Sequence, residues 1–169
     1  LKRADVIIVT KVDLAQEDLL PMHTILRKNN FHAIFAEAVY EPIKLVNVKD
    51  ADKSQEVSSL KTRDIVLFSA IGNADAFERT VRALGANIKK TFSFLDHHVY
   101  TKKDLARIIE EAQWQNVTTL ITTQKDAVKL KELVGMCPSD MNIFALTVSL
   151  KIIKGEKELE ERIHAVLRR

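Results

Sequence analysis

Short apolar runs alternate with amphipathic helical segments along almost the whole chain. The runs at residues 4–10 and 64–68 are nearly continuous, which is typical of strands buried on both faces of a parallel sheet. The segment at residues 74–84 differs, because its apolar side chains recur at helical spacing. A strand–helix alternation of this kind predicts an α/β fold. In such a fold a mostly parallel sheet carries helices on both faces and forms three layers.

The same patterns give approximate bounds for each element. The expected strands lie at residues 4–10, 32–38, 64–68, 87–94, 117–122 and 141–148, and the expected helices at residues 15–28, 74–84, 101–114, 126–134 and 155–169. The first helix can begin as late as Pro21, since proline is tolerated in the first turn. Residues 40–63 include Pro42 and a long polar stretch, and they predict an irregular insertion or loop.

The length indicates how the chain is organised. A chain of 169 residues is expected to form a single α/β domain, residues 1–169, with a sizeable core. It starts at Leu1 and enters a strand almost at once, whereas central parallel strands seldom open a domain. We therefore expect the sequence to begin in the middle of a larger protein.

Composition excludes several classes of protein. A hydrophobic content of 46% and a charged content of 29% are ordinary for a soluble globular chain. The single cysteine, Cys137, excludes an internal disulfide framework and fits a reducing compartment. The net charge of +3 is too small to indicate nucleic acid, so we expect no such partner. No apolar run approaches the roughly 20 residues of a membrane span, and no signal peptide is visible.

Polar clusters follow two of the expected strands. Asp96, His97 and His98 come directly after the strand at residues 87–94, and residues 122–126 end the next strand in the same way. Chemistry in open α/β sheets gathers at the carboxyl ends of strands. The two clusters therefore predict one site.

The adjacent histidines cannot both face that site if the backbone is extended, since neighbouring side chains alternate faces. An imidazole beside a carboxylate, as in Asp96-His97, is a reasonable proton acceptor because its pKa lies near neutrality. The alternative is a turn that is merely polar. A zinc site would need three or four ligands, and the sequence shows no cysteine pair or HExxH motif to complete one.

Lys125 and Asp126 stand where a strand gives way to a helix. A lysine there can bind an anion together with the free N–H groups of the helix terminus, and the alternative is an ordinary solvated turn. A third signal is Thr10-Lys11-Val12-Asp13, which resembles the guanine-binding TKxD element of P-loop GTPases. However, the chain contains no GxxxxGK(S/T) phosphate loop.

Four segments of the chain resemble those of one family. Residues 3–11 are similar to a RADxxxxTK stretch, and residues 69–85 to an (A/S)xxGxPxxF…LG stretch. Residues 94–97 match FPDH and residues 122–129 match TTEKDAVK, and these two matches are the most specific. The family is the tetraacyldisaccharide 4′-kinases, the lipid A 4′-kinases of Gram-negative envelope synthesis. The resemblance covers most of the chain in the right order.

The sequence departs from the family pattern at three positions. Leu95 stands in place of the usual proline, Gln124 in place of glutamate, and Ala74 in place of the proline after Asn73. Loss of the proline should loosen the turn before Asp96, and loss of the glutamate removes a charge near the lysine. None of these changes removes the histidine or the Lys-Asp pair.

The resemblance implies a P-loop-related kinase. Such an enzyme transfers the γ-phosphate of ATP, with Mg²⁺, to the 4′-hydroxyl of tetraacyldisaccharide 1-phosphate. The family's phosphate loop and acidic residues lie upstream of the RAD strand and are missing from this sequence, so ATP and Mg²⁺ are expected to bind mainly to that N-terminal half. The chain resembles the C-terminal half, which we expect to be inactive alone.

The resemblance also implies roles for single residues. His97, with Asp96, is expected to be catalytic, and His97 would orient or deprotonate the acceptor hydroxyl. Lys125 would hold an anionic group of nucleotide or lipid, with Asp126 fixing it. The expected substrate- or nucleotide-binding residues are Lys11, Thr123, Lys125 and Asp126. No metal ligand is assigned in this chain.

A lipid substrate implies peripheral attachment to the cytoplasmic face of the inner membrane. Exposed lysines could attract anionic headgroups there at about 1 kcal/mol each, or they could form an ordinary solvated face. They are Lys89, Lys90, Lys102 and Lys103. Two readings from other classes stay open: a GTPase-related fragment that uses Asp13, and a non-catalytic α/β binding module.

Overall fold

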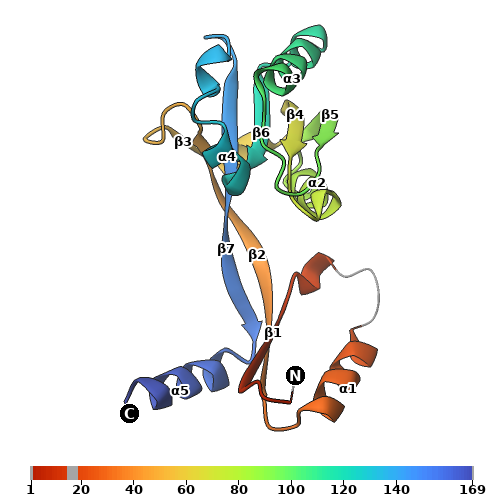
Figure 1. The fold of residues 1–169 in the computed structure, drawn as a ribbon, viewed down its shortest axis with the longest axis vertical. Helices are drawn as coiled ribbons and strands as arrows, with labels where there is room; N and C mark the ends of the chain where they lie inside the picture. The colour runs from red at the N-terminus through yellow and green to blue at the C-terminus, as the bar shows by residue number, and fades with distance from the viewer. Residues whose placement is uncertain (1, 15–18, 169) are drawn as a thin grey trace. The chain divides into compact units, whose positions relative to one another are not determined.

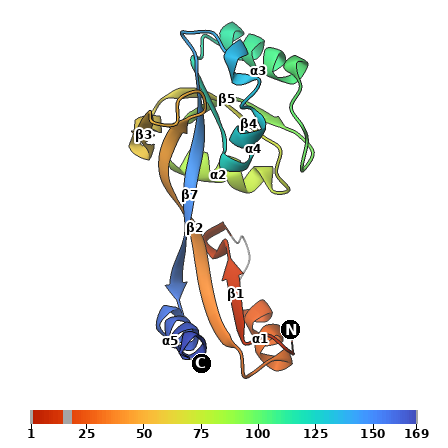
Figure 2. The ribbon, with the colours of Figure 1, turned by 60° about the vertical axis from the view of Figure 1, so that its left-hand side comes forward.

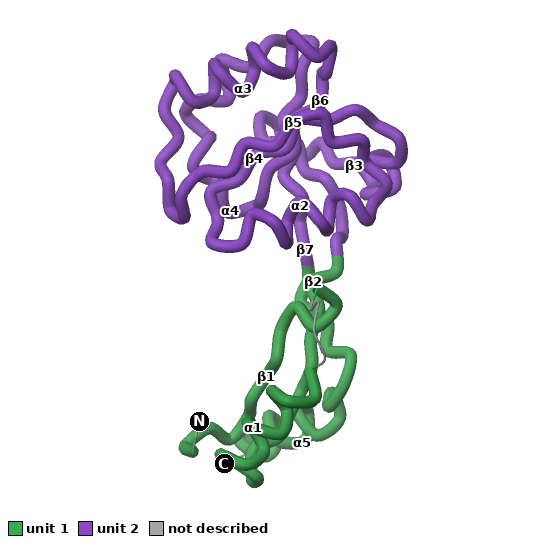
Figure 3. Tube along the Cα trace, turned by 90° about the vertical axis from the view of Figure 1, so that its right-hand side faces the viewer, with its two compact units in different colours: residues 1–41, 149–169 green, residues 42–148 purple. Residues whose placement is uncertain are grey.

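The computed structural model describes residues 2–14 and 19–168. The chain divides into two compact units: unit 1, residues 1–41 and 149–169, and unit 2, residues 42–148 (Figure 3). The sequence predicted one domain. The difference arises because two strands are much longer than expected, so that each of them contributes residues to both units.

The elements follow one another as a strand–helix alternation (Figure 1). The strands are β1 Val6–Thr10, β2 Ile34–Asn47, β3 Ser54–Glu56, β4 Asp64–Ser69, β5 Asn87–Ser93, β6 Thr119–Thr123 and β7 Asn142–Lys154. The α-helices are α1 Leu20–Asn29, α2 Ala74–Ala83, α3 Lys102–Trp114, α4 Gln124–Lys129 and α5 Glu156–Leu167, and the 3₁₀ turns are Val12–Leu14, Val57–Leu60 and Val134–Met136.

The strands form a sheet in the order β1-β2-β7-β6-β4-β5, with β3 paired to β2. The pairs β1–β2, β4–β5, β4–β6 and β6–β7 are parallel, and β2–β3 is antiparallel. The mostly parallel α/β sheet predicted from the sequence is therefore confirmed. In unit 2 the parallel strands β5, β4 and β6 end at a common carboxyl edge, whereas β7 continues to Lys154.

Alternate residues of β4 face two different cores. Val66 and Phe68 pack in a cluster with the apolar face of α3, which includes Leu105 and Ile108. Ile65 and Leu67 pack in a second cluster, to which α2 contributes a buried valine. Helices therefore cover both faces of the unit 2 sheet, with α3 on one side and α2 on the other (Figure 2). This is the predicted three-layer arrangement.

Unit 1 is built from β1, the first part of β2, the last part of β7, α1 and α5. Its described apolar residues include few buried ones, and β1, which the sequence predicted to be buried on both faces, is only partly covered. Gly155 begins α5 with φ +76°, and a Cβ there would meet the carbonyl oxygen of Phe35 at 2.3 Å. Only glycine fits this contact between α5 and β2.

Residues 40–63, for which the sequence predicted an extended segment and then an irregular insertion or loop, contain more regular structure than expected. This stretch contains the second part of β2, all of β3 and a 3₁₀ turn that ends at the fully buried Leu60. Pro42 is accommodated within β2, and Leu45 lies in the core of unit 2. Part of the predicted first helix, residues 15–18, lies outside the described residues, and α1 begins with Pro21 in its first turn.

Candidate functional site

Three turns meet at the carboxyl edge of the unit 2 sheet. Two of them follow β4 and β5, and the third is the first turn of helix α4, which follows β6 directly. The backbone N–H of Ala70, after β4, donates to Asp126 Oδ2, after β6, at 3.0 Å. Gly72, also after β4, lies so close to Asp96 that an added Cβ would be 3.3 Å from Asp96 Oδ2. Both polar clusters predicted from the sequence therefore adjoin the same turn. We call these three turns the strand-end site.

Asp96 and His97 are the central residues of a tight turn. The turn is closed by the His98 N–H, which donates to the Leu95 carbonyl at 3.0 Å. His97 has φ +62°, and its own N–H donates to Asp96 Oδ1 at 3.0 Å. Its ring is 93% exposed, with Nε2 3.7 Å from Asp96 Oδ2. The turn thus presents an imidazole to solvent beside a carboxylate, which is the geometry of an accessible proton acceptor.

His98 is held quite differently. Its ring stacks on Phe94, with centroids 4.8 Å apart, and meets the edge of Tyr100 at 5.6 Å. Its Nε2 lies 3.0 Å from Asp104 Oδ2. The two histidines therefore face different surroundings, although the backbone between them is a turn rather than the extended strand that the sequence argument assumed.

Asp126 is an internal residue with no exposed surface. Besides the Ala70 N–H, its Oδ2 accepts a hydrogen bond from the Thr123 hydroxyl at 2.8 Å, and its Oδ1 accepts one from Lys129 Nζ at 3.0 Å. The Thr123 hydroxyl in turn accepts from the Asp126 N–H at 3.1 Å and caps α4. Buried charges of this kind persist when they are paired and hydrogen-bonded.

This network corrects one sequence expectation. Asp126 was expected to fix Lys125, but its partner is Lys129, three residues further along the helix. Lys125 is exposed on the first turn of α4, and the hydroxyl of Thr123 is engaged inside the protein. Sequence reasoning missed Lys129. The signal that could have found it is the i, i+3 spacing of opposite charges in residues 126–129.

Tyr100 can be excluded as a proton acceptor in the strand-end site. It is buried, and its ring meets Phe68 edge-on at 5.7 Å. Burial, reinforced by the Asp126 carboxylate, raises the pKa of Tyr100 well above its usual range. The phenol therefore stays protonated at any working pH.

Lys11, the remaining residue predicted to bind substrate or nucleotide, belongs to unit 1. It follows β1, has φ +61°, and places its ammonium 6.0 Å from the centre of the Tyr40 ring. Both Lys11 and its partner Tyr40 belong to unit 1.

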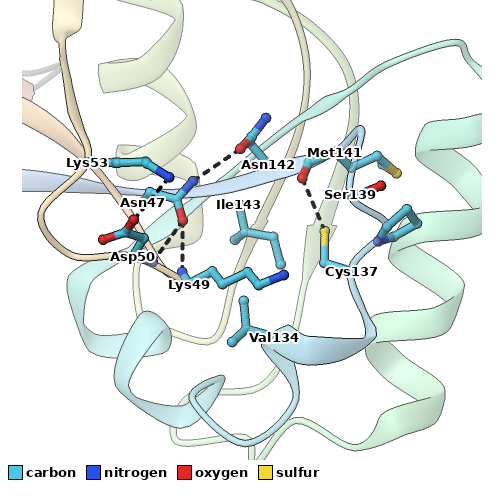
Figure 4. A pocket seen from close by; sticks show the side chains of 11 residues that line it. Asn47, Lys49, Asp50, Lys53, Val134, Cys137, Ser139, Met141, Asn142 and Ile143 are labelled. Atoms are coloured by element: carbon cyan, nitrogen blue, oxygen red, sulfur yellow. Dashed lines mark hydrogen bonds and ion pairs between the residues drawn. The ribbon is translucent and has the colours of Figure 1, made fainter.

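A separate pocket of about 430 Å³ opens near the amino end of β7 (Figure 4). Its lining includes Lys49, the buried Cys137 and Asn142. The Cys137 thiol donates to the Met141 carbonyl at 3.7 Å, and burial raises its pKa. None of the residues predicted from sequence to form the site lines this pocket.

Among the described residues, no three His, Cys, Asp or Glu side chains lie close enough together to hold a metal ion. Within the same residues, no helix is both long enough and apolar enough to cross a membrane.

Comparison with known proteins shows the family of this chain. The family model of the tetraacyldisaccharide-1-P 4'-kinases matches residues 1–168. The tetraacyldisaccharide 4'-kinase of Bdellovibrio bacteriovorus is 33% identical over 168 residues, which cover 99% of this chain and 46% of that protein. The kinase of Elusimicrobium minutum is 32% identical over 164 residues, which cover 95% of this chain and 41% of that protein.

A solved structure shares the fold. It is the "apo" form of LpxK from Aquifex aeolicus in complex with ATP, which matches with a TM-score of 0.55 and 20% identity over 96% of this chain and 52% of that one. The chain thus spans about half the length of the relatives it matches. It belongs to the tetraacyldisaccharide-1-P 4'-kinase family.

Proposed function

We propose that this chain is part of a kinase of lipid A biosynthesis. The complete enzyme transfers the γ-phosphate of ATP to the 4′-hydroxyl of tetraacyldisaccharide 1-phosphate. Family membership supports the reaction, and the exposed His97 beside Asp96 on the strand-end site is the observation that supports a role for this chain. The 169-residue chain alone is expected to be inactive.

In this proposal His97 Nε2 takes or orients the proton of the acceptor hydroxyl. Phosphoryl transfer depends mainly on positioning and charge neutralisation, so a correctly placed proton acceptor is what this site can supply. Asp96 Oδ2, 3.7 Å from that nitrogen, stabilises the imidazolium that forms. The glycine at position 72 leaves room for the Asp96 carboxylate against the turn after β4.

The nucleotide and Mg²⁺ are proposed to bind mainly to the N-terminal half that the relatives carry. The chain contains no GxxxxGK(S/T) sequence, and its described residues form no metal-binding group. We therefore assign no Mg²⁺ ligand here and derive no step through the metal. Lys11 and the exposed Lys125 are proposed to contact anionic groups of nucleotide or lipid, each from its own unit.

Thr123 and Asp126 are proposed to act indirectly. Their side chains are bonded to each other, and Asp126 is also bonded to the turn after β4, so they hold that turn and the start of α4 in place rather than contacting substrate.

The enzyme is proposed to work as a peripheral protein at the cytoplasmic face of the inner membrane, where a lipid acceptor would lie. Lys90, Lys102 and Lys103 are exposed and could attract anionic headgroups, whereas Lys89 is paired with Asp64 at 3.2 Å.

The decisive experiment is His97→Ala in the complete enzyme, assayed with ATP and the lipid acceptor. Loss of a general base lowers kcat by about 10²-fold or more, and we expect a loss of this size. His164→Ala, which removes an exposed histidine of α5, is the matched control and should retain normal turnover. Unchanged turnover of the His97 variant would refute the proposal.

A further inference from the structure

The side chain of His97 makes few contacts that could fix its position. Its ring is almost fully exposed, and its N–H donates to the carboxylate of the neighbouring Asp96. Its left-handed backbone, φ +62°, is a conformation that non-glycine residues seldom adopt without support from their surroundings. The position of the imidazole therefore depends on whatever fixes the turn at residues 95–98.

The turn is anchored on its upstream side by the sheet. The Phe94 N–H donates to the Ser69 carbonyl at 2.9 Å, which extends the β4–β5 pairing beyond the end of β5. On the downstream side it is anchored by the start of α3, where Thr101 and Asp104 form a capping box. Between these anchors, residues 95–100 contain no helix or strand.

His98 connects the two anchors. One face of its ring lies against Phe94, with an interplanar angle of 17°, and its Nε2 reaches Asp104 Oδ2 at 3.0 Å. Tyr100 packs edge-on against both rings, at 5.2 Å from Phe94 and 5.6 Å from His98. His98, the residue next to His97, is thus held by Phe94 on one side of the turn and by Asp104 on the other.

Asp104 is suited to hold this contact at any working pH. Burial alone would raise its pKa, but hydrogen bonds from the Thr101 N–H and from His98 and the Thr101 hydroxyl outweigh burial and lower it. The carboxylate stays ionised, and its Oδ2 accepts from Thr101 at 2.8 Å while it faces the His98 ring. A charged acceptor makes a stronger hydrogen bond than a neutral one.

We propose that His98, held by Phe94 and Asp104, is a positioning residue that sets the place of the His97 imidazole in the phosphoryl-transfer reaction. This inference rests on the proposed function of His97. His98 touches no reacting atom in this scheme. It acts by fixing the turn, because a displacement of about 1 Å at a catalytic group can reduce a rate by about 10²-fold.

The test uses two variants that separate the contacts of His98. His98→Phe keeps an aromatic ring against Phe94 but removes the hydrogen bond to Asp104. His98→Gln places a donor near the former Nε2 and restores that bond. In the complete enzyme we expect His98→Phe to lower kcat by about 10-fold or more with unchanged KM for ATP and lipid, and His98→Gln to recover most of the loss. His164→Phe is the matched control.

A loss that appears only in KM would indicate that His98 contacts substrate, and kcat within twofold of the parent would show that it positions nothing. Either result overturns the inference.

A second measurement does not depend on kinase activity. In the 169-residue chain, the ¹H–¹⁵N heteronuclear NOE of the His97 amide should be that of ordered backbone, and it should fall in His98→Phe and recover in His98→Gln. An unchanged NOE in His98→Phe overturns the inference even if the role of His97 stands. If the NOE fell in His98→Phe but His97→Ala kept full activity, the proposed function would be refuted. The dependence of the His97 backbone on His98 would still stand.

Discussion

Asp126 shows how one side chain can organise a site without facing it. Its carboxylate accepts hydrogen bonds from the Ala70 N–H, the Thr123 hydroxyl and Lys129, so it ties the turn after β4 to the start of α4. Because the turn after β4 also abuts Asp96, the position of the turn at residues 95–98 depends indirectly on this buried side chain.

Replacing Asp126 with asparagine tests that role. An amide has one oxygen, so its NH₂ must face either the Ala70 N–H or Lys129, and in both cases a donor meets a donor. Loss of one partner of a buried charged pair destabilises proteins by about 3 kcal/mol. We expect a decrease of that size in the free energy of unfolding of the chain, measured by urea denaturation with circular dichroism. Asp140→Asn, at an exposed position, should change it little, and equal stability of the two variants would contradict the role.

At the scale of a single element, α3 depends on its first turn. Thr101 accepts the Asp104 N–H at 3.2 Å, and Asp104 accepts the Thr101 N–H at 2.8 Å, which satisfies two of the N–H groups that a helix start leaves free. The same carboxylate anchors His98. One residue thus stabilises the helix and the turn that precedes it.

The capping carboxylate should give α3 a measurable pH dependence. The pKa of Asp104 is lowered in the folded protein relative to its ordinary value of 3.8, so its contribution is complete above pH 3.8 and is lost as the pH falls through the folded-state pKa. Asp104→Asn should cost about 1 kcal/mol of unfolding free energy at pH 5, and the difference between the two proteins should shrink below pH 3.8.

The difference in unfolding free energy between the parent and Asp104→Asn isolates Asp104, because both proteins keep the other carboxyl groups whose pKa values are lowered. Hydrogen bonds from Lys53 and Arg82 lower the pKa values of Asp50 and Glu78, and these groups respond to acid equally in each. If urea titrations gave the same difference in unfolding free energy between the two proteins down to pH 2.5, the charge of the Asp104 carboxylate would contribute nothing to stability.

Elements built on strong local patterns could be predicted from the sequence. β4 and β6 are apolar runs bounded by turns, and the α3 cap is visible in the spacing of Thr101 and Asp104. The second part of β2 and the last part of β7 could not be predicted in this way. Their side chains are mixed, as in residues 149–154, and strand pairing rather than local pattern makes them strands. The second part of β2 pairs with β3, and its Lys44 carbonyl accepts from the Thr147 hydroxyl of β7, whereas Lys154 in the last part of β7 bonds to Glu37 in the first part of β2.

The candidate site shows the same division. His97 and Asp96 stand out in the sequence, whereas the approach of Asp96 to Gly72 is a tertiary contact between residues more than 20 positions apart. Only part of the role of Asp126 could be predicted from the sequence. Its i, i+3 spacing to Lys129 is a local pattern, whereas its hydrogen bond with Ala70 joins residues far apart in the chain.

At the scale of the whole molecule, the two units differ in how much apolar surface they bury. The clusters of unit 2 contain large side chains such as Phe68, Leu105 and Leu120. The buried apolar side chains described in unit 1 are alanines, at positions 33, 36 and 38. Since burial of apolar area is the main stabilising contribution to folding, the units should differ in stability.

Hydrogen exchange should reveal that difference in two helices of nearly equal length. α3 has 13 residues and buries Leu105, Ile108, Ile109 and Ala112, whereas α5 has 12 residues and buries none of those described. Amides of α5 should therefore exchange by local opening, at least about 100-fold faster than those of α3, while β4 and β6 exchange only on global unfolding. Mass spectrometry of peptides from the deuterated chain measures exchange in both helices in one sample. The two helices serve as controls for each other because their lengths are nearly equal. If α5 and β4 became deuterated together in one cooperative step, the two units would be one folding unit, and the assignment of weaker stability to unit 1 would be wrong.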